Sequence, residues 1–574
     1  MQPWQPAPEA TFFHTATPHF LSPDHGLAPP ECIDMTQPLT SLTPAQLKTA
    51  IADGYEIALI DVREEGLFGL GHLLLSSSAP LSRLELLIER LVPRRGARLV
   101  LIDTQGETAP IAAQRLQHAG YHNLHVLAGG TTAWVAAGYP LFDGVYVPSK
   151  AFGEVIEHTL KTPVIDVDAL EQLRRDGVNH VVVDSRPWEE YRLRTIPGAI
   201  NCPGAELAQR IQAIAPDPET LVVVNCGGRT RSILGAQTLI HAAIPNPVLS
   251  LKDGAQGWVL SGRKLEVGAD RVAPYLPAQA PALAQARKVA QQAGVQIVDW
   301  QTVQGFVQHD SARSVFLFDV RGPQEYQASH LAGWRHAPGG QLVQSTDHYI
   351  GTLRARVVLH DPQLLRALTT AAWVQQLGLH EVFVLEQAPA TAALQAGPEI
   401  QPVLPVTFGD AVWIQPSDLA TLQASAQSNA VAVFDIDSSL DYRHAHIPGS
   451  WHVGRPALGA LWATEPEHFK HTTLVITSAD GTLAGLAAAE WRRATGRDVR
   501  ALLGGTQAWQ QQGLPTEAGL ARAAPEQFDR WYGPWAYEGE AQLQAFRDYL
   551  SWEVDLAERI HLDGDLPIQL QAVA

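Results

Sequence analysis

The sequence predicts an α/β protein in which one unit, a mainly parallel sheet with helices on both faces, occurs four times. The first observation is an apolar run that ends in aspartate, and it recurs at residues 58–61, 181–184, 316–319 and 432–435. A second apolar run follows each of these, at residues 99–102, 222–225, 357–360 and 474–477, and a turn and a helical pattern come next. Short apolar strands that alternate with helices are typical of parallel sheets.

The spacing between these runs places the four copies in register. The residue after the second run is Asp103, Cys226, Asp361 or Ser478, and it follows the first aspartate by 42, 42, 42 and 43 residues. In three copies a tryptophan lies 31, 32 and 31 residues further on, preceded by glycine: Gly129-Gly130 with Trp134, Gly254 with Trp258, and Gly504-Gly505 with Trp509. The third copy has Ala392-Ala393 there instead. Units of about 120 residues have the size of domains, so we expect each to hold its own core.

Helix start signals precede the first strand in three copies. Thr43-Pro44 supplies an N-cap and a proline at the first helical position, and Pro416-Ser417 begins a similar segment. Residues 168–171 have the spacing of a capping box. Each copy is therefore expected to begin with a helix that leads into its first central strand.

These patterns divide the chain into an N-terminal extension, four domains, a linker and a tail. The expected bounds are 1–35 (extension), 36–145 (domain one), 152–268 (domain two), 269–289 (linker), 290–398 (domain three), 408–518 (domain four) and 525–574 (helical tail). The extension is rich in Pro, His and Thr without a period, so we expect it to be flexible. The chain has two methionines, Met1 and Met35, and because Met35 opens the first patterned segment, a start of translation at Met35 is the alternative to one at Met1.

The tail carries an apolar stripe at helical spacing. An aromatic segment with Trp531, Tyr532, Trp535 and Tyr537 precedes it, and the stripe consists of Leu543, Phe546, Leu550, Val554, Ala557 and Ile560. Because such stripes usually face a core, we expect this helix to pack on its own chain, with a dimer contact as the alternative.

Composition and charge argue against several classes of protein. The 574 residues carry a formal net charge of −18, which disfavours non-specific nucleic-acid binding. No apolar stretch approaches the roughly 20 residues of a membrane helix, and the N-terminus has no secretory signal. We therefore expect neither a membrane nor a nucleic-acid partner. Three cysteines do not make a disulfide framework, so we expect a reducing, cytoplasmic location.

The sequence Cys226-Gly227-Gly228-Arg229-Thr230-Arg231 follows the second strand of domain two. Three features of this loop would favour the thiolate form of Cys226, which is the nucleophilic form. Glycines allow the backbone N–H groups to point inward as a nest, a helix offers its positive end, and two arginines add charge. The same groups would bind an anionic substrate against the sulfur.

The number of residues between cysteine and arginine narrows the chemistry. Cysteine-dependent phosphatases carry Cys-x5-Arg, whereas Arg231 stands at Cys-x4-Arg and Ser232 occupies the longer position. A shorter loop encloses a smaller anion, which favours sulfur chemistry over a phosphatase. The scattered histidines show no metal-ligand spacing, so we expect no metal.

Taken together, these motifs resemble the rhodanese family, over roughly residues 36–518. Domain two carries the active loop and the upstream motifs Asp184-Ser185-Arg186, Glu190-Tyr191 and Ile196-Pro197-Gly198-Ala199. The other domains keep parts of this pattern, namely Asp61-Val62-Arg63 with Gly71-His72, Asp319-Val320-Arg321 with Glu325-Tyr326, and His446-Ile447-Pro448-Gly449. Domain two departs from the family by Arg194-Thr195 in place of Gly-His, which would reshape the rim of the pocket.

The resemblance implies a sulfurtransferase that works by double displacement without a metal or organic cofactor. Cys226 would take sulfur from thiosulfate or a similar donor as a persulfide and pass it to cyanide, a thiol or an acceptor protein. Two alternatives remain open. One is 3-mercaptopyruvate as the donor; the other is a scaffold or sulfur-carrier binding protein that keeps the loop by descent.

The same resemblance implies that only domain two reacts. Asp103, Asp361 and Ser478 stand at the cysteine position of the other domains, and none of them can carry sulfane sulfur. At the position of Arg231 these domains have Thr108, Arg366 and Leu483.

The substrate contacts expected in domain two are Gly227, Gly228, Arg229, Thr230, Arg231 and Arg186, of which Arg231 is the firmest. The alternatives are that Arg229 points to solvent and that Arg186 pairs with Glu190. Cys202 is expected to be structural, with a resolving role for the persulfide as the alternative, and Cys32 lies in the extension.

Overall fold

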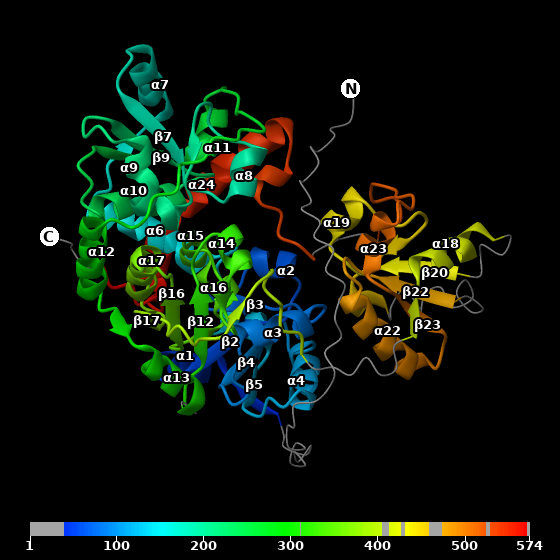
Figure 1. The fold of residues 1–574 in the computed structure, drawn as a ribbon. Helices are drawn as coiled ribbons and strands as arrows, with labels where there is room; N and C mark the ends of the chain where they lie inside the picture. Colours follow the sequence, from blue (N-terminus) through cyan, green and yellow to red (C-terminus); the bar gives the residue numbers. More distant parts are fainter. Residues whose placement is uncertain are drawn as a thin grey trace.

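The computed structural model describes residues 39–309, 312–404, 412–425, 431–458, 473–523 and 529–570. Each of the four repeats forms a parallel sheet of the same strand order, flanked by helices, so the predicted fold class is confirmed (Figure 1). Cys32, Met1 and Met35 lie outside the described residues. None of the described helices has the length and apolar character needed to cross a bilayer.

Domain one has the strand order β1-β5-β4-β2, with β3 also paired to β2. Its strands are β1 (Thr40–Leu42), β2 (Ile57–Asp61), β3 (Ser77–Ser78), β4 (Leu99–Ile102) and β5 (Leu124–Leu127). Its helices are α1 (Pro44–Ala52), α2 (Glu65–Leu70), α3 (Leu84–Leu91), α4 (Ala109–His118) and α5 (Gly130–Ala136). Helix α1 begins with the predicted cap, since the Thr43 hydroxyl accepts the N–H of Gln46 at 3.3 Å.

Domain two has the order β6-β10-β9-β7-β8, and all of its pairings are parallel. Its strands are β6 (Val164–Ile165), β7 (His180–Asp184), β8 (Ile200–Asn201), β9 (Leu221–Asn225) and β10 (Val248–Leu251). Its helices are α7 (Val167–Arg175), α8 (Trp188–Leu193), η1 (Gly204–Glu206), α9 (Leu207–Ile214), α10 (Thr230–His241) and α11 (Gly254–Leu260). Helix α7 is capped by Asp166, whose carboxylate accepts the N–H of Ala169, so the capping box expected at Asp168 is wrong by two residues.

Domain three has the order β11-β17-β16-β12-β14, with a two-stranded sheet of β13 and β18 beside it. Its strands are β11 (Gln296–Val298), β12 (Val315–Asp319), β13 (His330–Leu331), β14 (Arg335–His336), β15 (Thr352–Leu353), β16 (Arg356–His360), β17 (Glu381–Leu385) and β18 (Leu394–Gln395). Its helices are α12 (Ala280–Gln292), α13 (Trp300–His309), α14 (Pro323–Ala328), α15 (Gly339–Gln344), α16 (Thr346–Tyr349) and α17 (Leu365–Gln376).

Domain four has the order β19-β23-β22-β20-β21. Its strands are β19 (Val412–Ile414), β20 (Val431–Asp435), β21 (Trp451–His452), β22 (Thr473–Thr477) and β23 (Val499–Leu502). Its described helices are α18 (Pro416–Ala424), α19 (Ser439–His444), η3 (Arg455–Ala457), α22 (Thr482–Thr495) and α23 (Gly505–Gln511). In Figure 1 this domain (yellow to orange) stands to one side of the other three.

One apolar core spans parts of the first three domains, in addition to the cluster that each of the four domains holds by itself, as expected. Strand β15 of domain three pairs antiparallel with β2 and so extends the sheet of domain one, with Thr352 opposite Ala58. One apolar cluster contains buried residues of domains one and three, of α10, and of α6 (Val147–Leu160), which connects domains one and two. Smaller clusters lie within single domains.

The tail forms η4 (Pro534–Ala536) and the long helix α24 (Gly539–Asp563), which packs against α6 (Figure 1). The expectation that this helix packs on its own chain is confirmed. Its stripe was predicted only in part, because the buried side consists of Phe546, Leu550, Glu553, Leu556 and Ile560. Val554 is 38% exposed, and a carboxylate, Glu553, is fully buried in its place.

A buried ion pair at the end of the first central strand recurs in three domains. In domain two the Asp184 carboxylate accepts Nε and Nη2 of Arg186 at 2.9 and 2.7 Å, and Asp61–Arg63 and Asp319–Arg321 repeat this geometry. Domain four has Asp437 at the arginine position, so Asp435 has no such cation. Burial then raises the pKa of Asp435 to about 7.

We predict that Asp435→Asn stabilises domain four in a pH-dependent way. A carboxyl whose folded pKa is raised favours folding at low pH, and that contribution is lost as the pH rises from about 4 to 7. The variant removes this loss, so its free energy of unfolding should exceed that of the native domain by roughly 1–3 kcal/mol at pH 8 and by less at pH 5. Pulse proteolysis in urea measures both values. Asp319→Asn is the control: it breaks the pair with Arg321 and should lower the free energy of unfolding of domain three at both pH values. If Asp435→Asn raised the free energy of unfolding equally at pH 5 and pH 8, the prediction would be contradicted.

Candidate active site

The predicted loop lies at the carboxyl end of β9, where α/β sheets bind their ligands. Cys226 directly follows β9, and α10 begins at Thr230, so the helix end faces the loop. Cys226 is 2% exposed, and its Sγ lies 3.5 Å from the hydroxyl of Ser232. The structure thus brings the thiol to the positive end of a buried helix.

The loop is held from behind by the start of α11. The N–H groups of Ala255 and Gln256 donate to the carbonyls of Cys226 and Gly227 at 2.9 and 3.1 Å. This approach requires Gly254, whose φ is +51° and where a Cβ would come within 2.5 Å of the Cys226 carbonyl oxygen. Gly130 and Gly505 fill the same role in domains one and four, which explains the repeated glycine of the landmark. The carbonyls point outward, so the N–H groups of the loop are left to point inward.

In two other domains, a side-chain oxygen of the first loop residue accepts such N–H groups. In domain one the Asp103 carboxylate accepts the N–H groups of Gly106, Thr108 and Ala109 at 2.6–2.9 Å. In domain four the Ser478 hydroxyl accepts the N–H of Ala484 at 3.2 Å. In the described part of the chain, no protein group accepts the N–H groups of residues 227–231 in domain two. The cradle around Cys226 therefore has capacity for an external anion.

Arg231 and its domain-three counterpart Arg366 differ in whether a protein carboxylate binds the edge formed by Nε and Nη2. Each pairs through both Nη atoms with a glutamate, Glu190 at 2.7 and 2.7 Å for Arg231 and Glu325 for Arg366. The second edge of Arg366, formed by Nε and Nη2, binds the Asp361 carboxylate at 3.2 and 2.9 Å. No described protein group takes the corresponding edge of Arg231, whose Nη2 lies 3.8 Å from the Cβ position of Gly227. Asp361 thus marks where a substrate oxyanion can bind in domain two.

Arg229 and Arg186, two residues predicted to contact substrate, bind protein carboxylates. The Arg229 guanidinium is bound by Glu154 at 2.8 Å, by Asp253 at 3.1 Å and by Glu157. It is only 7% exposed, so it neither points to solvent nor faces the cradle, and we no longer count it as a substrate contact. These carboxylates come from α6 and α11, which the loop motif does not reveal.

Arg186 binds a carboxylate of its own domain through two of its nitrogens. Its Nε and Nη2 pair with Asp184 and not with Glu190, the alternative partner, and Nη2 also donates to the carbonyl of Arg194. The unusual Thr195 donates its hydroxyl to Asp184 at 2.7 Å, and the Arg194 guanidinium lies 4.2 Å from the ring centre of Trp535 in the tail. Arg194 and Thr195 therefore connect this segment to the tail and to the Asp184 carboxylate.

Helices α6 and α24 cover the loop with three residues that the sequence did not single out. Thr230 donates its hydroxyl to the fully buried Glu553, and Lys150 lies 3.6 Å from the same carboxylate. The second oxygen of Glu553 has no hydrogen-bond partner among the described residues and lies beside Gly228, as does the ring of Tyr549. Burial and the Glu553 charge raise the pKa of Tyr549 to about 12.

Cys202 and the acidic residues near Arg229 offer no second reactive site. Cys202 is fully buried in an apolar cluster with Leu207 and Val224, and burial raises the pKa of its thiol. Within the described residues, one group has the proximity of metal ligands, Glu154 with Glu157 and His158. Both carboxylates already bind Arg229, so they do not favour a metal.

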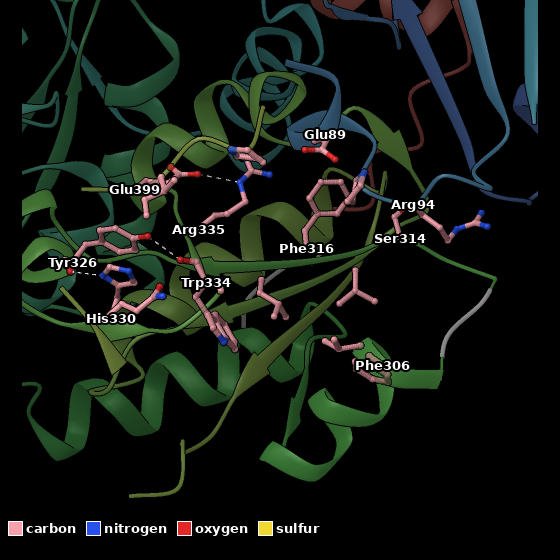
Figure 2. A pocket seen from close by; sticks show the side chains of 18 of the residues that line it. Glu89, Arg94, Phe306, Ser314, Phe316, Tyr326, His330, Trp334, Arg335 and Glu399 are labelled. Atoms are coloured by element: carbon pink, nitrogen blue, oxygen red, sulfur yellow. Dashed lines mark hydrogen bonds and ion pairs between the residues drawn. The ribbon is translucent and has the colours of Figure 1, made fainter. Parts of the chain in front are cut away.

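A large cavity elsewhere in the molecule is separate from the Cys226 loop. It has a volume of about 840 Å³, lies where domains one and three meet, and is lined in part by Phe306, Phe316 and Trp334, but by none of residues 226–231. Figure 2 shows two of the interactions among its polar groups: Arg335 pairs with Glu399 at 3.2 Å, and the Tyr326 hydroxyl donates to the Trp334 carbonyl at 2.9 Å.

Comparisons with known proteins point to one family. The sequence profile of the rhodanese-like domain matches residues 43–137, 166–261, 302–388 and 418–512. A crystal structure of a thiosulfate sulfurtransferase from Pseudomonas aeruginosa is 38% identical and has a TM-score of 0.87; the match covers 93% of this chain and 100% of that one.

Two curated proteins match over shorter stretches. An HTH-type transcriptional regulator of Mycobacterium tuberculosis is 36% identical over 111 residues, which are 19% of this chain and 48% of the regulator. A candidate sulfur carrier protein of Bacillus subtilis is 22% identical over 178 residues, 28% of this chain and 95% of that protein. The chain thus spans about half the length of the first relative and nearly all of the second.

We predict that Gly254→Ala displaces the Cys226 loop. The left-handed backbone and the clash with the Cys226 carbonyl should together cost about 2–4 kcal/mol of unfolding free energy. Gly262→Ala is the matched control, since it has φ +79° but open space, and it should cost about 1 kcal/mol. Denaturant unfolding measures both values, and the alkylation rate of Cys226 reports the loop. Similar losses in the two variants would contradict the role assigned to Gly254.

Proposed function

Because this chain belongs to the rhodanese-like domain family, we propose that it is a sulfurtransferase which carries sulfur as a persulfide on Cys226. The donor is thiosulfate or a similar sulfane compound, and the acceptor is a thiophile such as cyanide or a thiol. The observation that carries the proposal is the cradle of domain two, whose N–H groups and Arg231 edge have no protein anion, whereas Asp103 and Asp361 fill the equivalent cradles.

In the first step the Cys226 thiolate attacks the outer sulfur of thiosulfate. A bond forms between Sγ and that sulfur, the sulfur–sulfur bond of the donor breaks, and sulfite leaves with the electron pair. Negative charge passes to the new outer sulfur, which would lie among the N–H groups of residues 228–231 at the start of α10. Charge-assisted hydrogen bonds from such groups stabilise the anion before and after transfer.

In the second step the acceptor attacks the outer sulfur of the persulfide. Cyanide leaves as thiocyanate, or a thiolate leaves as its persulfide, and the electron pair of the broken bond returns to the Cys226 thiolate. The low exposure of Cys226 beneath α24 favours a small acceptor over a folded acceptor protein. A reducing cytoplasm is the compartment that suits this chemistry.

Domains one, three and four are proposed to be inactive. A carboxylate at Asp103 or Asp361 already occupies the position of the transferred sulfur, and the Ser478 hydroxyl cannot form a persulfide. In domain four Asp437 accepts the N–H of Ala479 at 2.6 Å, which places a further negative charge at that loop.

A second candidate donor is 3-mercaptopyruvate. In domain three the Nε edge of Arg366 binds a carboxylate, so the free edge of Arg231 would suit the carboxylate of that donor as well as a sulfonate oxygen. Steady-state kinetics with both donors decides between them, since the physiological donor should have the higher kcat/KM.

We predict that Cys226→Ala abolishes sulfur transfer from thiosulfate to cyanide. After incubation with thiosulfate, the intact mass of the native protein should increase by one sulfur atom that cyanide removes, and the variant should show no increase. Cys202→Ala is the control and should keep the mass increase, since Cys202 lies in the core. Transfer that survives in Cys226→Ala would contradict the Cys226 persulfide mechanism. Native protein that acquires no sulfur from any sulfane donor would favour the scaffold interpretation.

We predict that Arg231→Met raises KM for thiosulfate roughly 10- to 100-fold, the effect of losing one or two charge-assisted hydrogen bonds. Arg263→Met is the matched control, because Arg263 pairs with the exposed Asp168 on the surface of the same domain. Its KM should stay within twofold of the native value. Equal KM values for the two variants would exclude Arg231 from donor binding.

A further inference from the structure

Domains two and three face each other in a pseudo-symmetric pair. Residues that lie 135 apart in sequence are equivalent: Cys226 with Asp361, Arg231 with Arg366, and Glu190 with Glu325. At the interface η1 of domain two meets α15 of domain three, and a Cβ on Gly340 would lie only 3.3 Å from the Gly204 nitrogen. This glycine contact lets side chains from each domain reach the other domain's cradle.

The residues that cross the interface are themselves equivalent. Gln341 of domain three accepts from Nη1 of Arg231 at 3.1 Å, and Glu206 of domain two lies 3.8 Å from Nη1 of Arg366. Gln341 and Glu206 are also 135 residues apart. The two cradles therefore receive the same contact from their partner domain, but one receives a neutral amide and the other a carboxylate.

This difference changes the charge that each arginine presents. Arg366 is surrounded by three carboxylates, those of Asp361, Glu325 and Glu206. Arg231 has one, Glu190, and the amide of Gln341 takes its remaining Nη1 hydrogen without neutralising the guanidinium. A second carboxylate at this point would repel an anion at the Nε edge.

We propose that domain three completes the site of domain two, with Gln341 as a positioning residue for Arg231. Its neutral acceptor fixes the guanidinium while leaving charge and the Nε edge for an anionic donor. The inference rests on the proposed sulfurtransferase function for its substrate, and it assigns domain three a part in donor selection.

The decisive variant is Gln341→Glu, which gives Arg231 the environment of Arg366. KM for thiosulfate should rise about tenfold, with a smaller change in kcat, because the added carboxylate opposes binding of the dianion. A singly charged organic thiosulfonate should lose less. Gln341→Met, which removes the acceptor without adding charge, should show a smaller rise in KM, and this difference separates charge from packing. Glu206→Gln, the equivalent change at the domain-three cradle, is the control and should leave KM within twofold.

A second readout does not depend on sulfur transfer. Alkylation of Cys226 by iodoacetate, an anion, should slow about tenfold in Gln341→Glu, whereas alkylation by neutral iodoacetamide should stay within twofold of the native rate. Unchanged selectivity between the two reagents, or an unchanged KM, would overturn the role of Gln341. If native protein transfers no sulfur but the alkylation selectivity shifts as stated, the proposed function fails and the positioning role stands.

Discussion

Each repeat turns several backbone N–H groups toward one point at the start of a helix, and the free energy of leaving such buried donors without an acceptor determines what stands there. Domain one supplies the Asp103 carboxylate, domain three supplies Asp361 with Arg366, and domain four supplies the Ser478 hydroxyl. In domains one, two and four the next helix approaches through a glycine and its N–H groups fix the carbonyl at the start of the loop. In domain two the same backbone surrounds a cysteine, and none of the described protein groups accepts the N–H groups of residues 227–231.

The domains that lack cysteine contribute to the molecule through contacts rather than chemistry. In domain three, β15 pairs with the sheet of domain one, and Gln341 accepts a hydrogen bond from Arg231 of domain two. Helix α6, which belongs to none of the matched family segments, supplies Glu154 to Arg229 and Lys150 to the roof of the site. Domain two thus receives contacts from domain three and from α6.

Regular spacing made much of this structure predictable. The constant offsets between aspartate, loop and tryptophan predicted the four sheets and the position of Cys226. This was possible because a strand and the turn after it are determined by residues close in sequence. The partners of the arginines were not predictable, because Glu154, Gln341 and Glu553 reach the loop from helices far away in the chain. The buried side of the tail helix was predicted only in part for a related reason: Glu553 is polar and did not belong to the apolar stripe, although Thr230 and Lys150 contact it in the interior.

The contact between Thr230 and Glu553 spans 323 residues of sequence. During synthesis the ribosome therefore completes the strands and loop of domain two long before it makes the helix that covers them, and domains generally fold in the order in which they emerge. The helix that covers the Cys226 loop is therefore made after the whole of the loop's own domain, and the covered arrangement forms only once both are present.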